Sequence, residues 1–193
     1  MRVYNAKEVL RKAFLDVLEA YNMDDITVKM VVIESGVSKQ TLYNHYGGLV
    51  DILEDIYKNE IFGAVIERYS YREWVEGFEK MLLYFQSRKK AFLHIYDSSY
   101  RREFLNMIRK HGVVLIQDGL DALSKERNLV LDKKDETFMM NYYLHVFLGI
   151  IELYFQSNMA EDPSYLTSRL DVMMRDHMKN SLDNIKKLYS GEF

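Results

Sequence analysis

Apolar and polar residues follow one another along most of the chain with the spacing of amphipathic helices. Between residues 6 and 21, for example, apolar side chains recur three and four positions apart, which places them on one face of a helix. A single proline and only nine glycines leave such segments largely uninterrupted. The pattern predicts an all-α fold, with further helices over residues 49–69, 71–87, 89–95, 101–125, 136–158 and 163–189.

Two shorter helical patterns flank Gly36, between Thr27 and Tyr46. Thr27 and Ser38 can each cap the helix that follows, because their hydroxyls accept a hydrogen bond from an orphan backbone N–H. Gly36 stands where the chain must reverse, and glycine takes a positive φ there without steric cost. Two short helices joined by a tight turn are typical of a helix-turn-helix, whose second helix enters the DNA major groove.

The second short helix carries polar side chains outward, while Leu42 and Tyr46 turn inward. Glutamine and asparagine can pair with adenine, threonine can touch a thymine methyl, and lysine can reach guanine or phosphate. Tyrosine and histidine are good phosphate donors. Short helices that begin with serine also show polar faces in other all-α proteins, so a purely structural role stays open. The predicted DNA contacts are Thr27, Lys29, Ser38, Lys39, Gln40, Thr41, Tyr43, Asn44 and His45.

These residues also carry a family resemblance. The stretch resembles the N-terminal domain of the TetR family of bacterial transcriptional regulators. The resemblance implies a helix-turn-helix DNA-binding domain over residues 1–48 and a ligand-binding and dimerisation domain over residues 49–193. The matching residues are Ile26, Thr27, Val28, Ser35, Gly36, Val37, Ser38, Thr41, Leu42, Tyr43, His45, Tyr46 and Leu53.

Three positions depart from the family's usual pattern. Leu49 stands where the family usually places a lysine that meets the DNA backbone, which leaves one phosphate contact without its usual donor. Val32 replaces a small residue and predicts slightly altered packing between the two short helices. Tyr46 replaces the usual phenylalanine, a change that we expect to be mild.

The segment 138–155 is apolar on almost all sides. Asn141, His145 and Glu152 interrupt it, so its longest apolar run falls far short of the ~20 residues that a membrane span needs. We therefore expect no membrane contact, but a helix buried both against its own core and against a partner subunit. The resemblance implies the same, since family members dimerise through their last two helices. The predicted homodimer interface contains Tyr142, Val146, Ile150, Leu153, Leu170, Met174, Met178 and Leu182.

Aromatic and methionine residues become frequent from residue 71 onward. Such side chains can line an apolar ligand cavity, or they can simply fill the core. The family resemblance favours a ligand site, because many members sense small molecules in this region. The local sequences at 84–85, 88–90 and 149–151 loosely resemble a subgroup related to dihydroxyacetone-kinase regulators, some of which respond to a protein partner. The predicted pocket residues are Tyr84, Phe85, Phe92, Tyr96, Phe104, Ile108, Met139, Tyr143 and Phe147.

The composition argues against other classes of protein. The chain has no cysteine, its five histidines do not pair at metal-site spacing, and no nucleotide-binding or hydrolase motif occurs. We therefore expect no metal, no cofactor and no enzyme activity. No secretory signal is present at the N-terminus, which predicts a cytoplasmic protein. The net charge of the chain is −3. Residues 1–46, which we call the head, carry six basic and six acidic side chains, so the head has no net charge.

The sequence thus predicts a homodimeric transcriptional regulator that binds a palindromic operator in double-stranded DNA. We expect a repressor, controlled by a small apolar or aromatic ligand or by a protein partner. Two heads on a two-fold axis double the phosphate contacts, which compensates for a neutral head. The alternative is a protein-interaction module or co-activator with the same fold and weak or lost DNA binding, which Leu49 and the neutral head favour.

Overall fold

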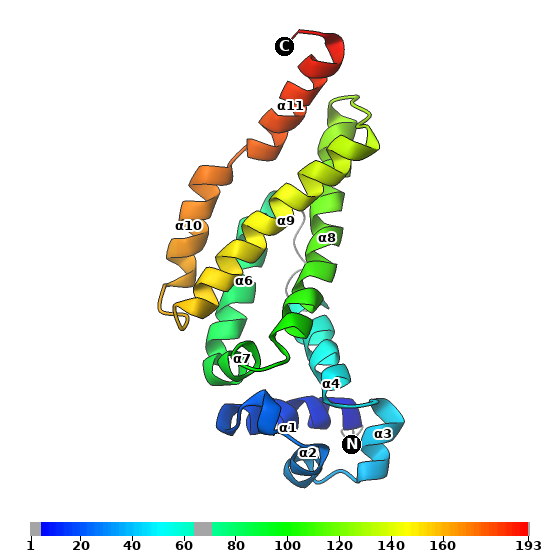
Figure 1. The fold of residues 1–193 in the computed structure, drawn as a ribbon, viewed down its shortest axis with the longest axis vertical. Coiled ribbons are helices and arrows are strands. Elements are labelled where there is room, and N and C mark those ends of the chain that lie inside the picture. Colours follow the sequence, from blue (N-terminus) through cyan, green and yellow to red (C-terminus); the bar gives the residue numbers. More distant parts are fainter. Residues whose placement is uncertain (1–4, 64–70, 193) are drawn as a thin grey trace. The chain divides into compact units, whose positions relative to one another are not determined.

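The structure is a computed structural model that describes residues 5–63 and 71–192 of the 193-residue chain. Over these ranges the regular elements are helices, which confirms the all-α prediction (Figure 1). A π-helical turn (Tyr57–Phe62) and two short 3-10 turns (Met23–Asp25 and Tyr71–Glu73) accompany the longer elements. The α-helices are α1 (Ala6–Ala20), α2 (Val28–Ser35), α3 (Lys39–His45), α4 (Leu49–Ile56), α6 (Trp74–Ser87), α7 (Lys89–Tyr96), α8 (Arg101–Glu126), α9 (Lys133–Gln156), α10 (Pro163–Met174) and α11 (His177–Ser190).

The chain divides into two compact units. Unit 1 is formed by Met1–Arg68 and Met81–Ile108, and unit 2 by Tyr69–Lys80 and Arg109–Phe193. Helices α6 and α8 therefore contribute residues to both units. Unit 1 extends beyond residue 48 because α4 and α7 pack against α1. The division into two functional regions at residue 48 stays a prediction.

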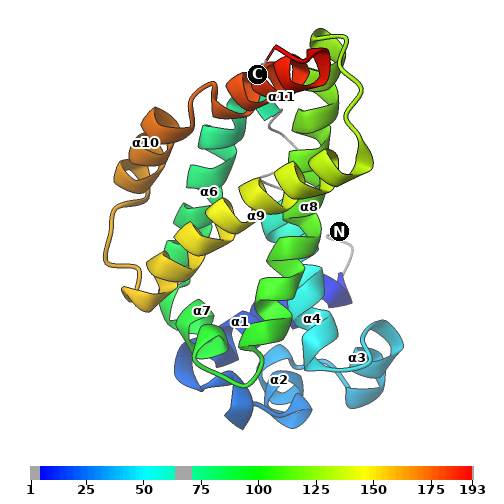
Figure 2. The ribbon, with the colours of Figure 1, turned by 45° about the horizontal axis from the view of Figure 1, so that its top comes forward.

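Unit 1 is built around α1, which packs against α2, α3, α4 and α7. Leu10, Phe14 and Leu18 follow one another at intervals of four and are fully buried, as the helical spacing predicted. Asn5 caps α1, because its side chain accepts a hydrogen bond from the backbone N–H of Glu8. Figures 1 and 2 both show α1, α2 and α3 gathered together, with α4 following α3 directly.

Unit 2 is built around α9, which packs against the 109–126 part of α8 and the start of α6. The ring of Phe147 meets the rings of Trp74 and Phe78 edge to face, with centroids 5.4 Å apart in both pairs. Gly112 lets α8 approach α9 closely, since a Cβ there would lie 3.0 Å from Leu144 Cδ1. Both views show these parts of α8 and α9 side by side (Figures 1 and 2).

The prediction of one continuous last helix over residues 163–189 is wrong. Helix α10 ends at Met174 and α11 begins at His177, because Asp176 between them has a left-handed backbone with φ 56°. Aspartate is one of the few residues besides glycine that adopt this conformation. Pro163 occupies the first turn of α10, as predicted.

The helix predicted over residues 49–69 also differs from the structure. Helix α4 passes at Tyr57 into the π-helical turn, in which the N–H of Gly63 bonds to the carbonyl of Lys58. Such turns carry one more residue per turn than an α-helix and are frequent at functional sites. The remainder of that predicted helix, from residue 64, lies outside the described residues.

Candidate nucleic-acid interface

The turn between α2 and α3 is fixed by bonds among its own residues. Gly36 ends α2 with a left-handed backbone, φ 66°, which confirms the role predicted for it. The hydroxyl of Ser35 accepts a hydrogen bond from the N–H of Val37 at 3.2 Å and donates one to the carbonyl of Val32. Val37 itself is buried at the turn. These contacts fix the angle between α2 and α3. The two helices are too short to fix that angle by packing along their own length.

Both predicted helix caps are confirmed. Thr27 Oγ1 accepts a hydrogen bond from the N–H of Met30 at 3.4 Å, and Ser38 Oγ accepts one from the N–H of Thr41 at 3.0 Å. The hydroxyl oxygens of Ser38 and Thr41 also lie 2.8 Å apart. The hydroxyls of Ser38 and Thr41 are therefore already engaged in stabilising the start of α3.

Helix α3 separates its buried and exposed side chains sharply. Leu42 is 0% exposed and anchors the helix in the head, while its neighbour Tyr43 is 47% exposed. Gln40 Nε2 donates a hydrogen bond to Asn44 Oδ1 at 3.0 Å, and Lys39 Nζ lies 5.7 Å from the centroid of the Tyr43 ring. We call the outward-facing set the α3 ridge; it consists of the exposed Lys39, Gln40, Tyr43, Asn44 and His45 and the partly exposed Thr41.

Helix α2 adds further exposed groups to the head. Thr27 and Lys29, both predicted to contact DNA, are exposed at its start. Ile33 lies one turn after Lys29 and is 69% exposed, which is unusual for an isoleucine. The sequence pattern did not single out this surface position.

The connection from α3 to α4 is a tight turn that a side chain of α4 closes. The N–H of Gly47 donates to Asp51 Oδ2 at 2.7 Å, and a Cβ at Gly47 would lie only 2.9 Å from that oxygen. The helix predicted from residue 49 does begin there, since α3 ends at His45 and α4 begins at Leu49. Leu49 is partly exposed and offers no charge at the start of α4.

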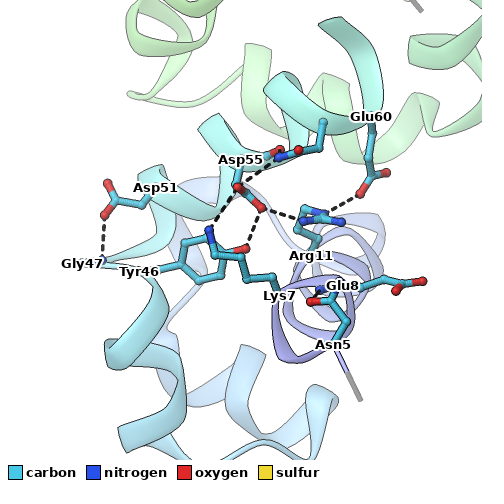
Figure 3. Close-up of polar contacts among 10 residues, drawn as sticks. Asn5, Lys7, Glu8, Arg11, Tyr46, Gly47, Asp51, Asp55 and Glu60 are labelled. Carbon is cyan, nitrogen blue, oxygen red and sulfur yellow. Dashed lines mark hydrogen bonds and ion pairs between the residues drawn. The ribbon is translucent and has the colours of Figure 1, made fainter. Parts of the chain in front are cut away.

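A network of polar side chains joins the end of α3 to α1 and α4 (Figure 3). The hydroxyl of Tyr46 donates to Asp55 Oδ2 at 2.8 Å, and Arg11 NH1 donates to the same oxygen at 2.7 Å. Arg11 Nε also donates to Glu60 Oε1 at 3.0 Å. The side chains of Arg11 and Asp55 are only 14% and 15% exposed, so solvent screens their ion pair weakly. The network was not predicted from the sequence, although a tyrosine in place of phenylalanine at position 46 was a signal for it.

The network changes the protonation behaviour of its members. Burial alone would raise the pKa of Asp55, but hydrogen bonds from Arg11 and Tyr46 and the nearby charge of Lys7 outweigh it and lower that pKa. Burial and the Asp55 carboxylate raise the pKa of the Tyr46 hydroxyl above its usual value. At neutral pH the hydroxyl is therefore a donor and the carboxylate an acceptor.

Two of the predicted DNA contacts are cations. Lys39, in the α3 ridge, and Lys29, in α2, are both exposed. Lys7 of α1 lies 3.5 Å from Asp55 Oδ1 and so pairs with a carboxylate of the same unit. Arg2 lies outside the described residues. The head therefore presents more hydrogen-bonding groups than charge.

The predicted pocket residues are split between the two units. In unit 1 the rings of Phe85 and Phe92 lie 4.9 Å apart edge to face, and Phe104 packs against both. All three are fully buried, so they form part of the core of that unit. Tyr84, Tyr96 and Ile108 also belong to unit 1, whereas Met139, Tyr143 and Phe147 belong to unit 2.

The predicted dimer residues differ in how much surface they offer. Tyr142 and Leu153 on α9 are 43% and 61% exposed. Leu170 and Leu182, in contrast, are 5% and 0% exposed, because they pack into the interior of their own chain. Neither side chain is therefore available for contact with a second copy of the chain. The remaining four residues, Val146, Ile150, Met174 and Met178, are partly exposed.

Comparison with known proteins agrees with this architecture. Residues 72–176, more than half of the chain, match a TetR family model described as "Transcriptional regulator C-terminal region". The solved structure titled "Dihydroxyacetone kinase operon activator DhaS" has a similar fold, with a TM-score of 0.65 and 15% sequence identity. The similarity covers 90% of this chain and 96% of that one. No curated protein matches the sequence.

The chain therefore belongs to the TetR family of transcriptional regulators. The matched residues begin after the helix-turn-helix. Among residues 5–63 and 71–192, no three histidine, aspartate or glutamate side chains form a metal site. Helix α9 is long and apolar enough to cross a membrane, but 39% of its most apolar window is buried within the fold.

Proposed function

We propose that the protein binds double-stranded DNA in a sequence-specific manner through the α3 ridge. The observation that carries this proposal is the contrast between the fully buried Leu42 and the exposed polar side chains around it. Amide side chains such as Gln40 and Asn44 suit adenine edges, while Lys39 and Tyr43 suit phosphate oxygens. The capped turns hold these groups outward before any DNA is present.

We also propose that the protein acts as a homodimer formed through α9, together with α10 and α11. Tyr142 and Leu153 lie on the exposed side of α9, and nothing lies within 4 Å of a Cβ built at Gly149 between them. An exposed apolar stripe with a small residue at its centre suits close approach of a second helix. Two heads related by a two-fold axis would bind a palindromic operator, with half-sites about one helical turn, ~34–36 Å, or a small multiple apart.

The regulatory role that we propose is repression in the cytoplasm, released or promoted by an effector. The partly exposed members of the aromatic clusters, such as Tyr84 and Phe147, would be the first to meet an apolar or aromatic ligand. A ligand that fits only one conformation of the regulator changes operator affinity by its differential affinity for the two conformations. A protein partner could act through the same equilibrium.

A second candidate function is a co-activator or protein-interaction module with weak DNA binding. Leu49 at the start of α4 and the engagement of Lys7 by Asp55 favour it, because both reduce the charge available to phosphates. The similar solved structure is titled as an operon activator, which is compatible with this second role.

Selection of bound fragments from random duplex DNA tests the proposal. The homodimeric regulator should enrich a palindromic consensus, whereas an interaction module should enrich nothing. The selection should be run at low salt, where counterion release contributes most to affinity, because a neutral head has little electrostatic attraction for DNA. A variant in which Gln40, Tyr43 and Asn44 are all alanine provides the matched control and should enrich no consensus.

A further inference from the structure

The hydroxyl of Tyr46 makes a contact that a phenylalanine could not make. Tyr46 follows the last residue of α3, and its ring is 4% exposed. Its hydroxyl donates a hydrogen bond of 2.8 Å to Asp55 Oδ2, nine residues further along the chain (Figure 3). The C-terminal end of α3 is thereby tied to α4.

The carboxylate of Asp55 accepts hydrogen bonds from three different parts of unit 1. Its Oδ2 atom accepts hydrogen bonds from Tyr46 and from Arg11 NH1 of α1. Its Oδ1 atom accepts one from Asn59 Nδ2 at 3.1 Å and lies 3.5 Å from Lys7 Nζ. Because a charged acceptor strengthens each of these bonds, the carboxylate holds α1, α4 and the end of α3 in one arrangement.

The π-helical turn explains how Arg11 can bind the carboxylates of Asp55 and Glu60 at the same time. In a regular α-helix, residues five apart point about 140° away from each other around the axis, at 3.6 residues per turn. The π-helical turn closes bonds between residues five apart and so reduces this angle. Asp55 and Glu60 therefore face the same side, where Arg11 NH1 and Nε reach one oxygen of each.

Tyr84 extends the network into α6. Its hydroxyl donates to Glu60 Oε2 at 2.7 Å, while Arg11 occupies Oε1 of the same carboxylate. Tyr46 and Tyr84 are thus the two ends of a continuous chain of hydrogen bonds through Asp55, Arg11 and Glu60. All five residues belong to unit 1.

We propose that Tyr46 is a positioning residue for DNA binding, and that the Asp55–Arg11–Glu60 chain couples it to Tyr84. Helix α3 has only seven residues, so its own backbone bonds fix its direction weakly. Leu42 anchors its middle, and the Tyr46 hydroxyl fixes its end. A displacement of α6 that weakens the bond between Tyr84 and Glu60 frees Arg11 and Asp55 to move, and the α3 ridge moves with them. This inference rests on the proposed DNA-binding function.

Operator affinities of Tyr46→Phe, Tyr84→Phe and the double variant test the proposal in the full chain. Each single substitution should weaken binding about threefold to tenfold on every sequence, because each removes a hydrogen bond to a charged group. The double variant should bind no more weakly than Tyr46→Phe alone, because both substitutions break the same chain. Equal affinities of wild type and Tyr46→Phe, or losses that multiply in the double variant, would overturn it.

Tyr154→Phe is the matched control, since it removes a buried hydroxyl for which the described residues provide no partner. Its operator affinity should equal that of the wild type. A spectroscopic measurement separates positioning from general stability. With 3-fluorotyrosine incorporated, Tyr84→Phe should shift the fluorine resonance of Tyr46, and Tyr154→Phe should leave it in place. An unmoved Tyr46 resonance in Tyr84→Phe contradicts the coupling.

The possible failures are distinguishable. If the wild type enriches a palindrome but Tyr46→Phe binds that palindrome equally well, this inference fails while the proposed function stands. If the wild type enriches no DNA sequence, the proposed function fails and the positioning role fails with it.

Discussion

Gln40 Nε2 donates a hydrogen bond to Asn44 Oδ1 at 3.0 Å, so two side chains suited to reading adenine are paired with each other in the free protein. The two residues are four apart and lie on the same side of α3. The bond links the two exposed amides and leaves Gln40 Oε1 and Asn44 Nδ2 with hydrogen-bonding capacity that it does not use. The α3 ridge is therefore organised before it meets a base.

Substitution of Asn44 should affect the base preference that Gln40 creates. In Asn44→Ala the Gln40 side chain loses its hydrogen bond to Asn44, and discrimination at the base pair that it reads should fall by about 1 kcal/mol. Affinities for operators altered one base pair at a time measure this. His45→Ala is the control, since it leaves the amide pair intact. Unchanged preference at every position in Asn44→Ala would show that the pair plays no part in recognition.

Gly36→Ala should destabilise the head through backbone strain alone. Nothing lies within 4 Å of a Cβ built at Gly36, but its φ of 66° disfavours any residue with a Cβ. We expect a loss of about 1 kcal/mol in the free energy of unfolding, measured by urea denaturation.

Gly48→Ala is the matched control for that substitution. Gly48 also has no atom within 4 Å of a built Cβ, and its φ of 178° is ordinary extended backbone. Its stability should stay within about 0.5 kcal/mol of the wild type. Equal losses for the two variants would contradict the role assigned to the left-handed turn.

Asp55→Asn should change how stability depends on pH. The pKa of Asp55 is lowered in the folded protein, so its ionised form stabilises the fold above the unfolded pKa of about 3.9. This contribution is lost as the pH falls through the lower, folded pKa. The wild type should therefore lose stability below about pH 4 more steeply than Asp55→Asn.

At pH 7 the same variant should be less stable by about 1–2 kcal/mol, because Arg11 and Tyr46 lose a charged acceptor. Thermal unfolding from pH 2.5 to pH 7 measures both effects. Asp51→Asn provides a comparison, since Asp51 accepts one backbone bond and takes no part in the ion pair with Arg11. Parallel pH profiles for wild type and Asp55→Asn would contradict the account of the network.

Leu153→Glu should weaken dimerisation at least about tenfold, because a charge would have to be buried at the subunit contact. Sedimentation at micromolar concentration should then shift from a particle of twice 23.0 kDa towards the single chain. Val130→Glu is the control, since Val130 is 86% exposed in the α8–α9 loop, outside the α9 stripe. A wild-type protein that sediments as a single chain would refute the homodimer itself.

The helix-turn-helix could be predicted from sequence because its determinants are local. Thr27, Gly36 and Ser38 each act within four residues of their own position, and the structure shows each in the predicted role. The burial of Leu42 followed from helical spacing for the same reason. The break at Asp176 could not be found in this way, since neither glycine nor proline stands there and the apolar spacing continues across it.

Local sequence patterns could not predict the network around Asp55, for a different reason. Arg11, Tyr46 and Tyr84 are far apart in the sequence, and only the tertiary packing of unit 1 brings them to the carboxylates of Asp55 and Glu60. The π-helical turn that aligns the two carboxylates has no residue signature that helical spacing would reveal. For Leu170 and Leu182, the apolar stripe could not distinguish burial inside one chain from burial between two.

The most direct test of sequence-specific binding through the α3 ridge is to compare Gln40→Ala and Tyr43→Ala on the selected operator and on single-base variants of it. We expect Gln40→Ala to lose about 1–3 kcal/mol of binding free energy only where its base is present, so that preference at that position disappears. Tyr43→Ala should weaken binding evenly on all sequences, as the loss of a phosphate contact does. If neither substitution changes affinity for any sequence, α3 is not the DNA-binding element of this protein.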